Sequence, residues 1–567
     1  MVFSSLSFLC VFLPTVFLIY LVIPWMKAKN ALLICASIAF YAYGEPVYVV
    51  LMLISSLVNW GFGLLLGAGA GAEADGGTGA GAKAGRDAQE GTGDDAKSAA
   101  AAKARVQRRR KALVAGAIVA NLGFLVVFKY AGMLAASIGA LIGDEAPFAG
   151  LALPIGISFY TFQALSYVID VYRGETPPQK SFFRVLLFIS FFPQLIAGPI
   201  IKYHDVEEQL AERKITIDGV ARGLRRFSVG LAKKILIANT FGSIADAVFA
   251  APQTEINIAV AWIGALAYLI QIYFDFSGYS DMAIGLARMF GFVYRENFDY
   301  PYISRNIREF WRRWHISLST WFKEYLYIPL GGNRKGRGRA VLNKLIVFGL
   351  CGLWHGASWT FVVWGLFHGI FLLLEEYLPI RRLPRALGWV YTLLVVCVGF
   401  VLFRSETFSQ ALFMLGQMFA GFHFEHMAVA RASWMLDPLT IFLFVVAIIA
   451  ATPIAHVVAR ALTRNGSDGA EIAAADEANT AAAVDKDETA DAADPSAAAD
   501  AADAAAAAGT IAAANTAETA AVAGRGKSNI IFRLIRTMSY VGALGLFVLC
   551  LLALSGGGYN PFIYFRF

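Results

Sequence analysis

The chain has 567 residues, of which 58% are hydrophobic and 16% charged, and its mean hydropathy is +0.58. Soluble domains are about 45–50% apolar and about 25% charged, so this composition excludes an ordinary soluble globular protein. Apolar stretches of about 20 residues recur, and each is long enough to cross the hydrocarbon core of a bilayer. We therefore predict an all-α polytopic membrane protein with roughly 10–13 membrane segments.

The formal net charge of +7 and the five cysteines exclude further classes. In a membrane protein, excess Lys and Arg marks cytoplasmic loops, so no nucleic-acid partner is expected. The cysteines are scattered through apolar segments without a C-x-x-C pair, which predicts neither a disulfide framework nor a zinc site. We expect no metal and no bound cofactor.

The N-terminal part, residues 1–67, contains three expected spans at roughly 5–25, 31–44 and 47–66. It lacks a basic leader and a cleavage site, so the first span is interpreted as retained, with the N-terminus outside. Residues 68–111 are predicted to be a cytoplasmic insert, disordered over 68–104, because Gly, Ala and acidic residues supply too little apolar surface to fold. The basic cluster that ends the insert holds it in the cytoplasm.

The central part, residues 112–464, is predicted to be the membrane core. Its polar residues Gln163, Ser166 and Asp170 are costly in a membrane helix unless they face protein or a wet cavity. The apolar run from Ser190 to Ile200 is short, broken by proline and flanked by cations on both sides, which predicts a re-entrant hairpin. Other expected segments fall at roughly 112–131, 229–250, 258–274, 386–404 and 437–457, with an interfacial one near 409–420.

The C-terminal part repeats the alternation of insert and span. Residues 465–526 are rich in Ala, Asp, Glu and Thr, lack aromatic residues, and are predicted to be a second disordered cytoplasmic insert. Residues 527–567 are expected to form a final span at roughly 537–555 and a tail outside the membrane.

The stretch 305–369 carries two histidines in unusual surroundings. Apolar residues from Phe310 to Tyr325 recur every three or four positions, which predicts one interfacial helix with Arg312 and Arg313 on its polar side. His315 lies at the edge of the apolar stripe. A purely structural role for this histidine remains an alternative.

His355 interrupts a strongly apolar run, where a neutral imidazole suits a general base or a hydrogen-bond acceptor. Ser358 and Trp359 follow three and four residues later and are expected on the same helical face. Alternatively, His355 only bonds a neighbouring helix. Asp275 and Asp281, near another apolar run, are either substrate-binding residues or structural ion-pair partners.

The two longest motifs, W-R-R-W-H-I-S-L-S-T-W-F-K-E-Y-L-Y-I-P-L-G-G-N-R and G-L-W-H-G-A-S-W-T-F-V-V-W-G-L-F-H-G, resemble the membrane-bound O-acyltransferase family. The branch that they resemble is the alginate O-acetyltransferase group. The resemblance extends to F-F-P-Q-L-I-A-G-P-I and to N-P-F-I-Y-F-R-F, and covers nearly all of the chain outside the two inserts. It implies a ring of tilted helices around a thinned centre, with a cytoplasmic entrance and an outward-facing funnel.

The resemblance also implies a function and assigns residues to it. The chain is expected to be a cell-membrane enzyme that moves an acyl group, acetyl in the first instance, from a cytoplasmic thioester donor, acetyl-CoA or an acyl carrier protein. The acceptor would be an extracytoplasmic polysaccharide or a relay acyltransferase. His355 matches the active-site histidine and would be the general base, and His315 matches a second histidine, which would orient the donor or stabilise the oxyanion.

The other candidate residues have weaker grounds. Arg312 and Arg313 would receive donor phosphates, and four further substrate-binding candidates are Asp275, Asp281, Ser358 and Trp359. Two alternatives stay open: D-alanyl transfer to teichoic acid, and a proton-coupled transporter whose buried carboxylates and His355 form a relay.

Overall fold

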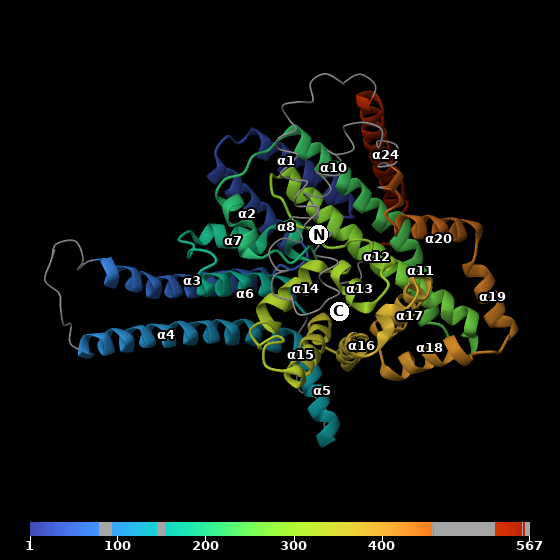
Figure 1. Ribbon diagram of the computed structural model, residues 1–567. Coiled ribbons are helices and arrows are strands. Elements are labelled where there is room, and N and C mark those ends of the chain that lie inside the picture. Colours follow the sequence, from blue (N-terminus) through green and yellow to red (C-terminus); the bar gives the residue numbers. More distant parts are fainter. Residues whose placement is uncertain (79–92, 144–152, 456, 459–527, 558, 562–567) are drawn as a thin grey trace.

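The computed structural model describes residues 1–78, 93–143, 153–455, 457–458, 528–557 and 559–561 (Figure 1). These residues form helices joined by short loops, and no β-strand occurs among them, which confirms the all-α prediction. The first half comprises η1 Ser7–Phe12, α1 Leu13–Val22, α2 Met26–Ala42, α3 Val49–Thr78, α4 Gly93–Leu125, η2 Val126–Tyr130, α5 Ala131–Ile142, α6 Ile157–Arg173, α7 Phe182–Ser190, α8 Phe192–Leu195, α9 Tyr203–Ala211, α10 Ile217–Ala232, η3 Lys233–Ala238, α11 Asn239–Phe249 and α12 Ile258–Met289.

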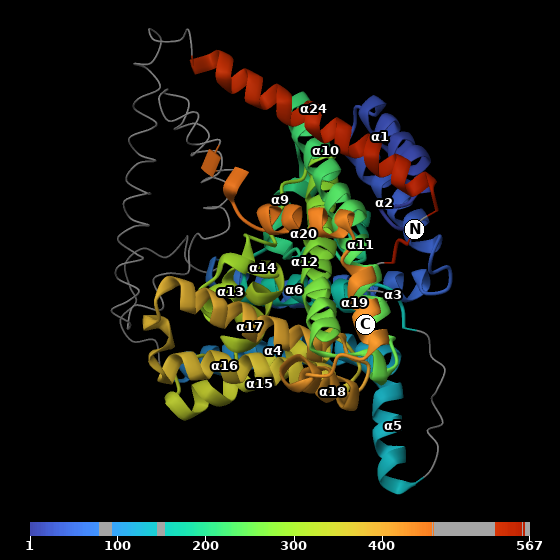
Figure 2. The ribbon, with the colours of Figure 1, turned by 90° about the vertical axis from the view of Figure 1, so that its right-hand side faces the viewer.

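The second half carries the histidine-rich stretch and ends in a long helix. It comprises α13 Ile307–Arg313, α14 Ile316–Phe322, η6 Lys323–Tyr327, α15 Arg337–His355, α16 Trp359–Tyr377, α17 Arg385–Arg404, α18 Phe408–Ala420, α19 His426–Met435, α20 Pro438–Ala450 and α24 Ser528–Ser555, with short 3₁₀ turns at Gln253–Glu255, Pro301–Ile303 and Pro379–Arg382. Figure 2 shows α15 and α16 side by side at the lower edge of the molecule.

Six helical segments of the described chain are long and apolar enough to cross a membrane: Val49–Ala68, Ala100–Ile142, Ile258–Met289, Trp359–Tyr377, Arg385–Arg404 and Leu534–Ser555. The pair α19 and α20, bent by 61°, makes a seventh if it is one broken span. The expected segments at 5–25 and 31–44 are shorter helices, η1–α1 and α2. The chain is therefore a multi-pass membrane protein.

The first low-complexity insert is more helical than predicted. Helix α3 continues to Thr78 and α4 begins at Gly93, and in Figure 1 both extend well beyond the body of the molecule. Residues 68–78 and 93–104 of the insert are thus described as helix, and its disorder and its placement in the cytoplasm stay predictions. Residues 93–104 are rich in alanine, the strongest helix former, which prolongs a helix even without a core to pack on. Residues 68–78 contain as many glycines as alanines, so helix propensity does not explain that extension. Residues 79–92, and the whole second insert at 465–526, lie outside the described residues.

Helices α10 and α12 cross in close contact through glycines. A Cβ at Gly230 would lie 2.6 Å from the carbonyl oxygen of Gly278, and a Cβ at Gly223 would lie 2.6 Å from that of Gly285. Small residues allow membrane helices to approach in this way. Helix α12 runs 15 residues past the expected end at 274, to Met289, and so carries both candidate aspartates on one continuous helix.

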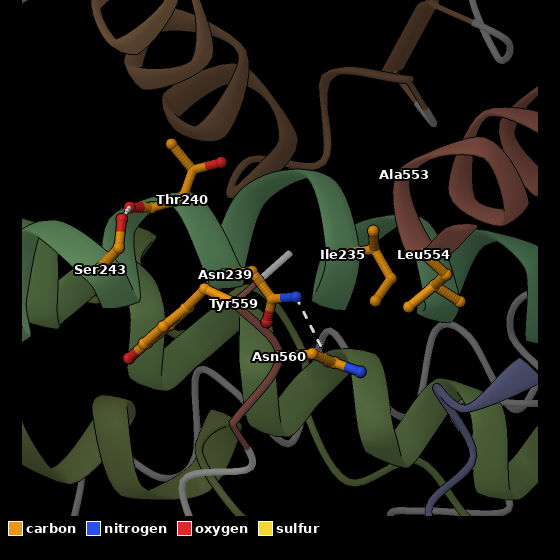
Figure 3. A pocket seen from close by; sticks show the side chains of 8 residues that line it. All are labelled: Ile235, Asn239, Thr240, Ser243, Ala553, Leu554, Tyr559 and Asn560. Carbon is orange, nitrogen blue, oxygen red and sulfur yellow. Dashed lines mark hydrogen bonds between the residues drawn. The ribbon is translucent and has the colours of Figure 1, made fainter. Parts of the chain in front are cut away.

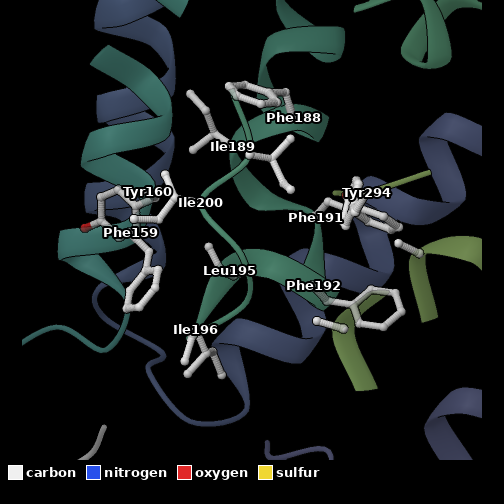
Figure 4. Close-up of a cluster of buried hydrophobic side chains, with 14 of the residues drawn as sticks. Phe159, Tyr160, Phe188, Ile189, Phe191, Phe192, Leu195, Ile196, Ile200 and Tyr294 are labelled. Carbon is white, nitrogen blue, oxygen red and sulfur yellow. The ribbon is translucent and has the colours of Figure 1, made fainter. Parts of the chain in front are cut away.

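The segment predicted to be re-entrant is short and enclosed by protein. Helices α7 and α8 are separated by an extended residue, Phe191, and every residue from Val185 to Lys202 is buried. Figure 4 shows the apolar side chains that surround this break, among them Phe188, Phe192 and Leu195. Irregular backbone at membrane depth is tolerated only where protein or water satisfies it, and here the protein encloses it.

Candidate active site

His315 lies in a break between two helices rather than within one. Helix α13 ends at Arg313 and α14 begins at Ile316, so the single interfacial helix predicted from Phe310 to Tyr325 is wrong. Between them His315 has φ 46° and ψ 53°, which is the left-handed backbone conformation that residues other than glycine rarely adopt. Residues held in this conformation cluster at functional sites, where surrounding contacts hold them in place. One such contact is the Ile316 N–H, which donates to the Asn297 carbonyl at 3.0 Å.

Asn297 is the centre of the hydrogen-bond network that holds the His315 ring. Its Oδ1 accepts from the Ser317 N–H at 3.1 Å and from the Ser317 hydroxyl at 2.8 Å, and lies 3.2 Å from His315 Nδ1. Its Nδ2 donates to Ser280 on α12 at 3.0 Å. Because the backbone N–H of Ser317 must face an acceptor, the amide oxygen is on this side, and an amide oxygen can only accept. The tautomer of His315 with its proton on Nδ1 satisfies this oxygen and leaves Nε2 unprotonated.

His355 is the last residue of α15. Gly356 after it is extended, with φ −160°, and α16 starts anew at Trp359. The two helices cross through glycines: a Cβ at Gly352 would lie 2.1 Å from the carbonyl oxygen of Phe361, and a Cβ at Gly365 would lie equally close to that of Phe348. The sequence G-L-W-H-G thus ends one helix and turns the chain back on itself.

The two histidines, 40 positions apart in the chain, face the same space. The ring centroids of His315 and His355 are 6.4 Å apart, and Trp354 lies beside both, at 6.2 Å and 5.0 Å. The rings of Trp364 and Phe403 pack edge-on against His355. At this separation the imidazole nitrogens are too far apart for a hydrogen bond of about 3 Å.

Both imidazoles are buried, His315 to 1% exposure and His355 to 7%. The Nε2 of His315 and the Nδ1 of His355 have no hydrogen-bond partner among the described residues. Burial, with a smaller contribution from His355, lowers the pKa of His315 well below its usual value. The site thus offers neutral imidazoles with free lone pairs, which is what acceptance of a proton requires.

The two candidate arginines do not join the histidines. Arg313 forms ion pairs with Asp299 at 2.7 Å and with Glu309 at 3.1 Å, whereas Arg312 is exposed on the surface. Exposed pairs of this kind contribute little to stability. Arg312 is the better placed of the two to meet an incoming anion.

The two candidate aspartates on α12 belong to ion pairs between helices. Asp281 is paired with Arg226 at 2.8 Å and with Lys233 at 2.7 Å, and Asp275 is paired with Lys234 at 2.7 Å. Asp275 and Lys234 are almost fully buried. These contacts support the structural alternative, because each carboxylate already neutralises a cation from α10 or η3.

Ser358 and Trp359 do not share a helical face with His355, because α15 has ended before them, so that expectation is wrong. Ser358 caps α16, its hydroxyl accepting from the Thr360 N–H at 3.3 Å. Trp359 is 60% exposed and donates from its indole to Ser137 on α5 at 3.1 Å. Spacing alone could not reveal the break that separates these residues from His355.

Asp170, Glu175 and His204 form a separate cluster whose potential metal-ligand atoms lie within 4.8 Å of one another. The ligand atoms are already engaged: Asp170 accepts from Tyr325 at 2.6 Å and lies 3.0 Å from His204 Nδ1. Burial opposes a charge on His204, but the bond and the ion pair with Asp170 outweigh it and raise the pKa of His204. We assign these residues to an ion-pair cluster that joins α6 and α9.

A cavity of about 290 Å³ lies elsewhere, between η3, α11 and the C-terminal end of α24 (Figure 3). Its polar lining includes Asn239, Thr240, Ser243 and Asn560. Asn239 donates to Asn560 at 3.3 Å, as Figure 3 shows, and Asn560 donates to the carbonyl of Ser4 at 2.9 Å, which ties the two ends of the chain together. Neither His315 nor His355 lines this cavity.

Asn297 is a site residue that the sequence does not indicate. It stands in G-F-V-Y-R-E-N-F-D-Y, with no periodicity or motif that marks it. Its distance from His315 in the chain, 18 positions, carries no helical relation. Only the fold, which places this loop beneath the start of α14, reveals its role.

The fold is that of a multi-pass membrane protein with two buried histidines close together in its interior. The model of the family MBOAT, membrane-bound O-acyltransferase family, matches residues 178–417, and the chain belongs to this family. It is an O-acyltransferase. It is 42% identical to a probable alginate O-acetylase, AlgI, of Azotobacter vinelandii over 74% of this chain and 78% of the relative.

Two further relatives carry other names. A peptidoglycan O-acetyltransferase of Helicobacter pylori is 33% identical over 74% of this chain and 80% of its own length. A teichoic acid D-alanyltransferase of Bacillus subtilis is 28% identical over 45% of this chain and 69% of its own length. The relatives thus span two acyl groups and three kinds of named polymer.

Proposed function

We propose that this protein transfers an acetyl group from a cytoplasmic thioester, acetyl-CoA or an acetylated carrier protein, to a hydroxyl of an extracytoplasmic polysaccharide or of a relay acyltransferase that modifies it. The protein would act in the cell membrane, surrounded by lipid, with its N-terminus outside and both low-complexity inserts in the cytoplasm. The thioester is a substrate, and the proposal includes no resident cofactor or metal.

The observation that carries the proposal is the pair of buried, neutral histidines. His355 takes the proton from the acceptor hydroxyl as its oxygen attacks the thioester carbonyl carbon. The C–S bond then breaks, and the leaving thiolate takes up the proton, so that an ester and a thiol are formed. A neutral base with a free nitrogen in a water-poor site suits this step.

The geometry favours one of the two roles expected for His315. In the tautomer that satisfies Asn297, with the proton on Nδ1, Nε2 can accept a hydrogen bond but cannot donate one to an oxyanion. His315 therefore orients a donor N–H, such as an amide of the pantetheine arm that both thioester donors share. Arg312, exposed at the end of α13, would receive the donor phosphates.

Acetyl transfer to a polysaccharide takes its support from the relatives. Two of those named above, with 33–42% identity over about three quarters of this chain, are named as O-acetylating enzymes of alginate or peptidoglycan. The D-alanyltransferase matches less than half of this chain. A single-sugar or lipid acceptor has no comparable support.

The test uses purified full-length protein in liposomes supplied with labelled acetyl thioester and an acceptor polysaccharide. His355→Ala should lower the rate of transfer by about 10²–10⁴-fold, the usual contribution of a general base. His368→Ala is the matched control, since His368 is another fully buried histidine packed on Trp364. Near-normal transfer by His355→Ala would overturn the assignment, and labelling from D-alanyl but not acetyl thioester would redirect it.

A further inference from the structure

The helix that ends at His355 is capped by side chains from a distant helix. Lys129, in the π-helical turn η2, donates from Nζ to the carbonyl of Trp354 at 2.5 Å, to the carbonyl of His355 at 3.4 Å, and to the Ser158 hydroxyl at 2.9 Å. The neighbouring Tyr130 donates to the carbonyl of Leu353 at 3.0 Å. Three successive carbonyls of the last turn of α15 are thus bonded by two adjacent side chains.

This cap replaces the usual one. The last four carbonyls of an α-helix have no partner within the helix. Many helices solve this with a glycine in the left-handed conformation directly after the end. Gly356 occupies that position but is extended, with φ −160°. The carbonyls beside the catalytic histidine therefore depend on Lys129 and Tyr130, and a π-helical turn is a common device for re-aiming a side chain at a functional site.

Lys129 reaches three polar groups from one nitrogen. The carbonyls of Trp354 and His355 can only accept, so Lys129 is the donor to both, whereas the Ser158 hydroxyl can accept or donate. Lys129 is 9% exposed, and none of the described carboxylates forms an ion pair with it. A cation near the C-terminus of a helix is stabilised by the helix dipole, but a buried intramembrane cation is costly and is usually functional.

We propose that Lys129 is a positioning residue for the acyl transfer: it fixes the last turn of α15 and thereby the direction of the His355 ring. The inference rests on the proposed role of His355 as general base. Lys129 touches neither donor nor acceptor in this scheme. It acts through the two carbonyls that it holds, those of Trp354 and His355.

The test compares three variants in the full-length protein, with steady-state transfer and thermal unfolding measured for each. Lys129→Met, which keeps the length of the side chain but removes all three bonds, should lower kcat by about 10- to 100-fold, because small misplacements of a catalytic group have effects of this size. The KM for the thioester should stay within about twofold. Lys129→Gln, which restores a neutral donor, should recover part of kcat.

Asn121→Ala is the matched structural control. Asn121 is buried on the same helix, two turns before Lys129, and exchanges hydrogen bonds with Asn59 at 2.8 and 3.0 Å. It should lower the unfolding temperature without lowering kcat. If Lys129→Met has the same kcat as this control, or changes only KM, the inference is overturned.

Tyr130→Phe covers the case in which Lys129→Met does not fold. It removes one hydroxyl and its bond to Leu353, and should lower kcat by about two- to fivefold in a folded protein; an unchanged kcat would then overturn the inference. Failure of the proposed function is separable from this result. If His355→Ala retains activity, the proposed function is wrong, whereas an inactive His355→Ala beside a fully active Lys129→Met overturns only the role of Lys129.

Discussion

Replacement of Asn297 by alanine should uncouple His315 from its partner. The change removes the acceptor of three donors, the Ser317 N–H, the Ser317 hydroxyl and the His315 Nδ1–H. The hydroxyl can rotate toward another acceptor, which leaves two donors without one. Each unsatisfied buried donor costs about 1–3 kcal/mol, so the free energy of unfolding should fall by about 2–6 kcal/mol. Once released, the ring can carry its proton on Nε2 and lose the lone pair that faces the substrate.

The kinetic consequence can be bounded. In the Ser-His-Asp triad, loss of the residue that fixes the histidine tautomer lowers kcat by about 10⁴-fold. His315 orients a substrate in our scheme rather than removing a proton, so we expect a decrease of about 10²-fold, the scale of a misplaced reactant. Single-turnover acyl transfer, measured after confirmation that the protein is folded, reports this step directly.

Two companion variants make the result decisive. Asn297→Asp keeps an acceptor for both donors and should retain kcat within about tenfold. Asn59→Ala removes a buried asparagine of a different helix pair and should reduce stability alone. Two results would refute the role assigned to this network. One is that Asn297→Ala folds and keeps the kcat of the unaltered protein. The other is that Asn297→Asp is as inactive as Asn297→Ala.

Three further outcomes are expected. Gly352→Ala places a Cβ 2.1 Å from the carbonyl of Phe361 and should lower the unfolding temperature, because overpacking costs about 1–3 kcal/mol or more. Glu375→Ala removes the carboxylate that accepts from the first N–H groups of α13, and should lower the free energy of unfolding by about 1–2 kcal/mol. Glu375→Gln keeps an acceptor and should unfold at a temperature closer to that of the unaltered protein. His204, whose pKa is raised by Asp170, stabilises the fold most below its usual pKa of about 6.5 and loses this contribution as the pH rises through the raised value. The stability difference between the unaltered protein and His204→Gln should therefore be largest at acid pH and shrink toward alkaline pH, and a difference that grows with pH would contradict this.

Membrane character and the main helices could be predicted because hydropathy depends on local sequence. The spans expected at 47–66 and 386–404 correspond to α3 and α17, and the interfacial segment at 409–420 to α18. Helix breaks were harder. Nothing local in R-R-W-H-I-S-L distinguishes one amphipathic helix from two, because the left-handed residue His315 is imposed by contacts with Asn297, which is distant in the chain.

The candidate site likewise combines residues that local sequence indicates with residues that only the fold identifies. A histidine in an apolar run is conspicuous, so the sequence indicates His355 as a candidate, and the long motifs indicate both His355 and His315. Ser358 and Trp359 were misplaced because an i, i+3 and i+4 argument assumes that a helix continues. Asn297 carries no sequence signal, and Lys129 carries only the general one of a lone lysine in an apolar run. Their partners His315 and Trp354 are identified only when the fold brings the residues together.

The cap on α15 also limits how far this enzyme can be divided. The matched family region begins at residue 178, whereas Lys129 and Tyr130 lie about 50 positions before it, on a helix that a minimal fragment would omit. A fragment that begins at residue 178 would keep both histidines and their tryptophans, but the last carbonyls of α15 would lose their bonds to Lys129 and Tyr130. On the role proposed for Lys129, the helix before the matched family region contributes to catalysis as well as to the fold.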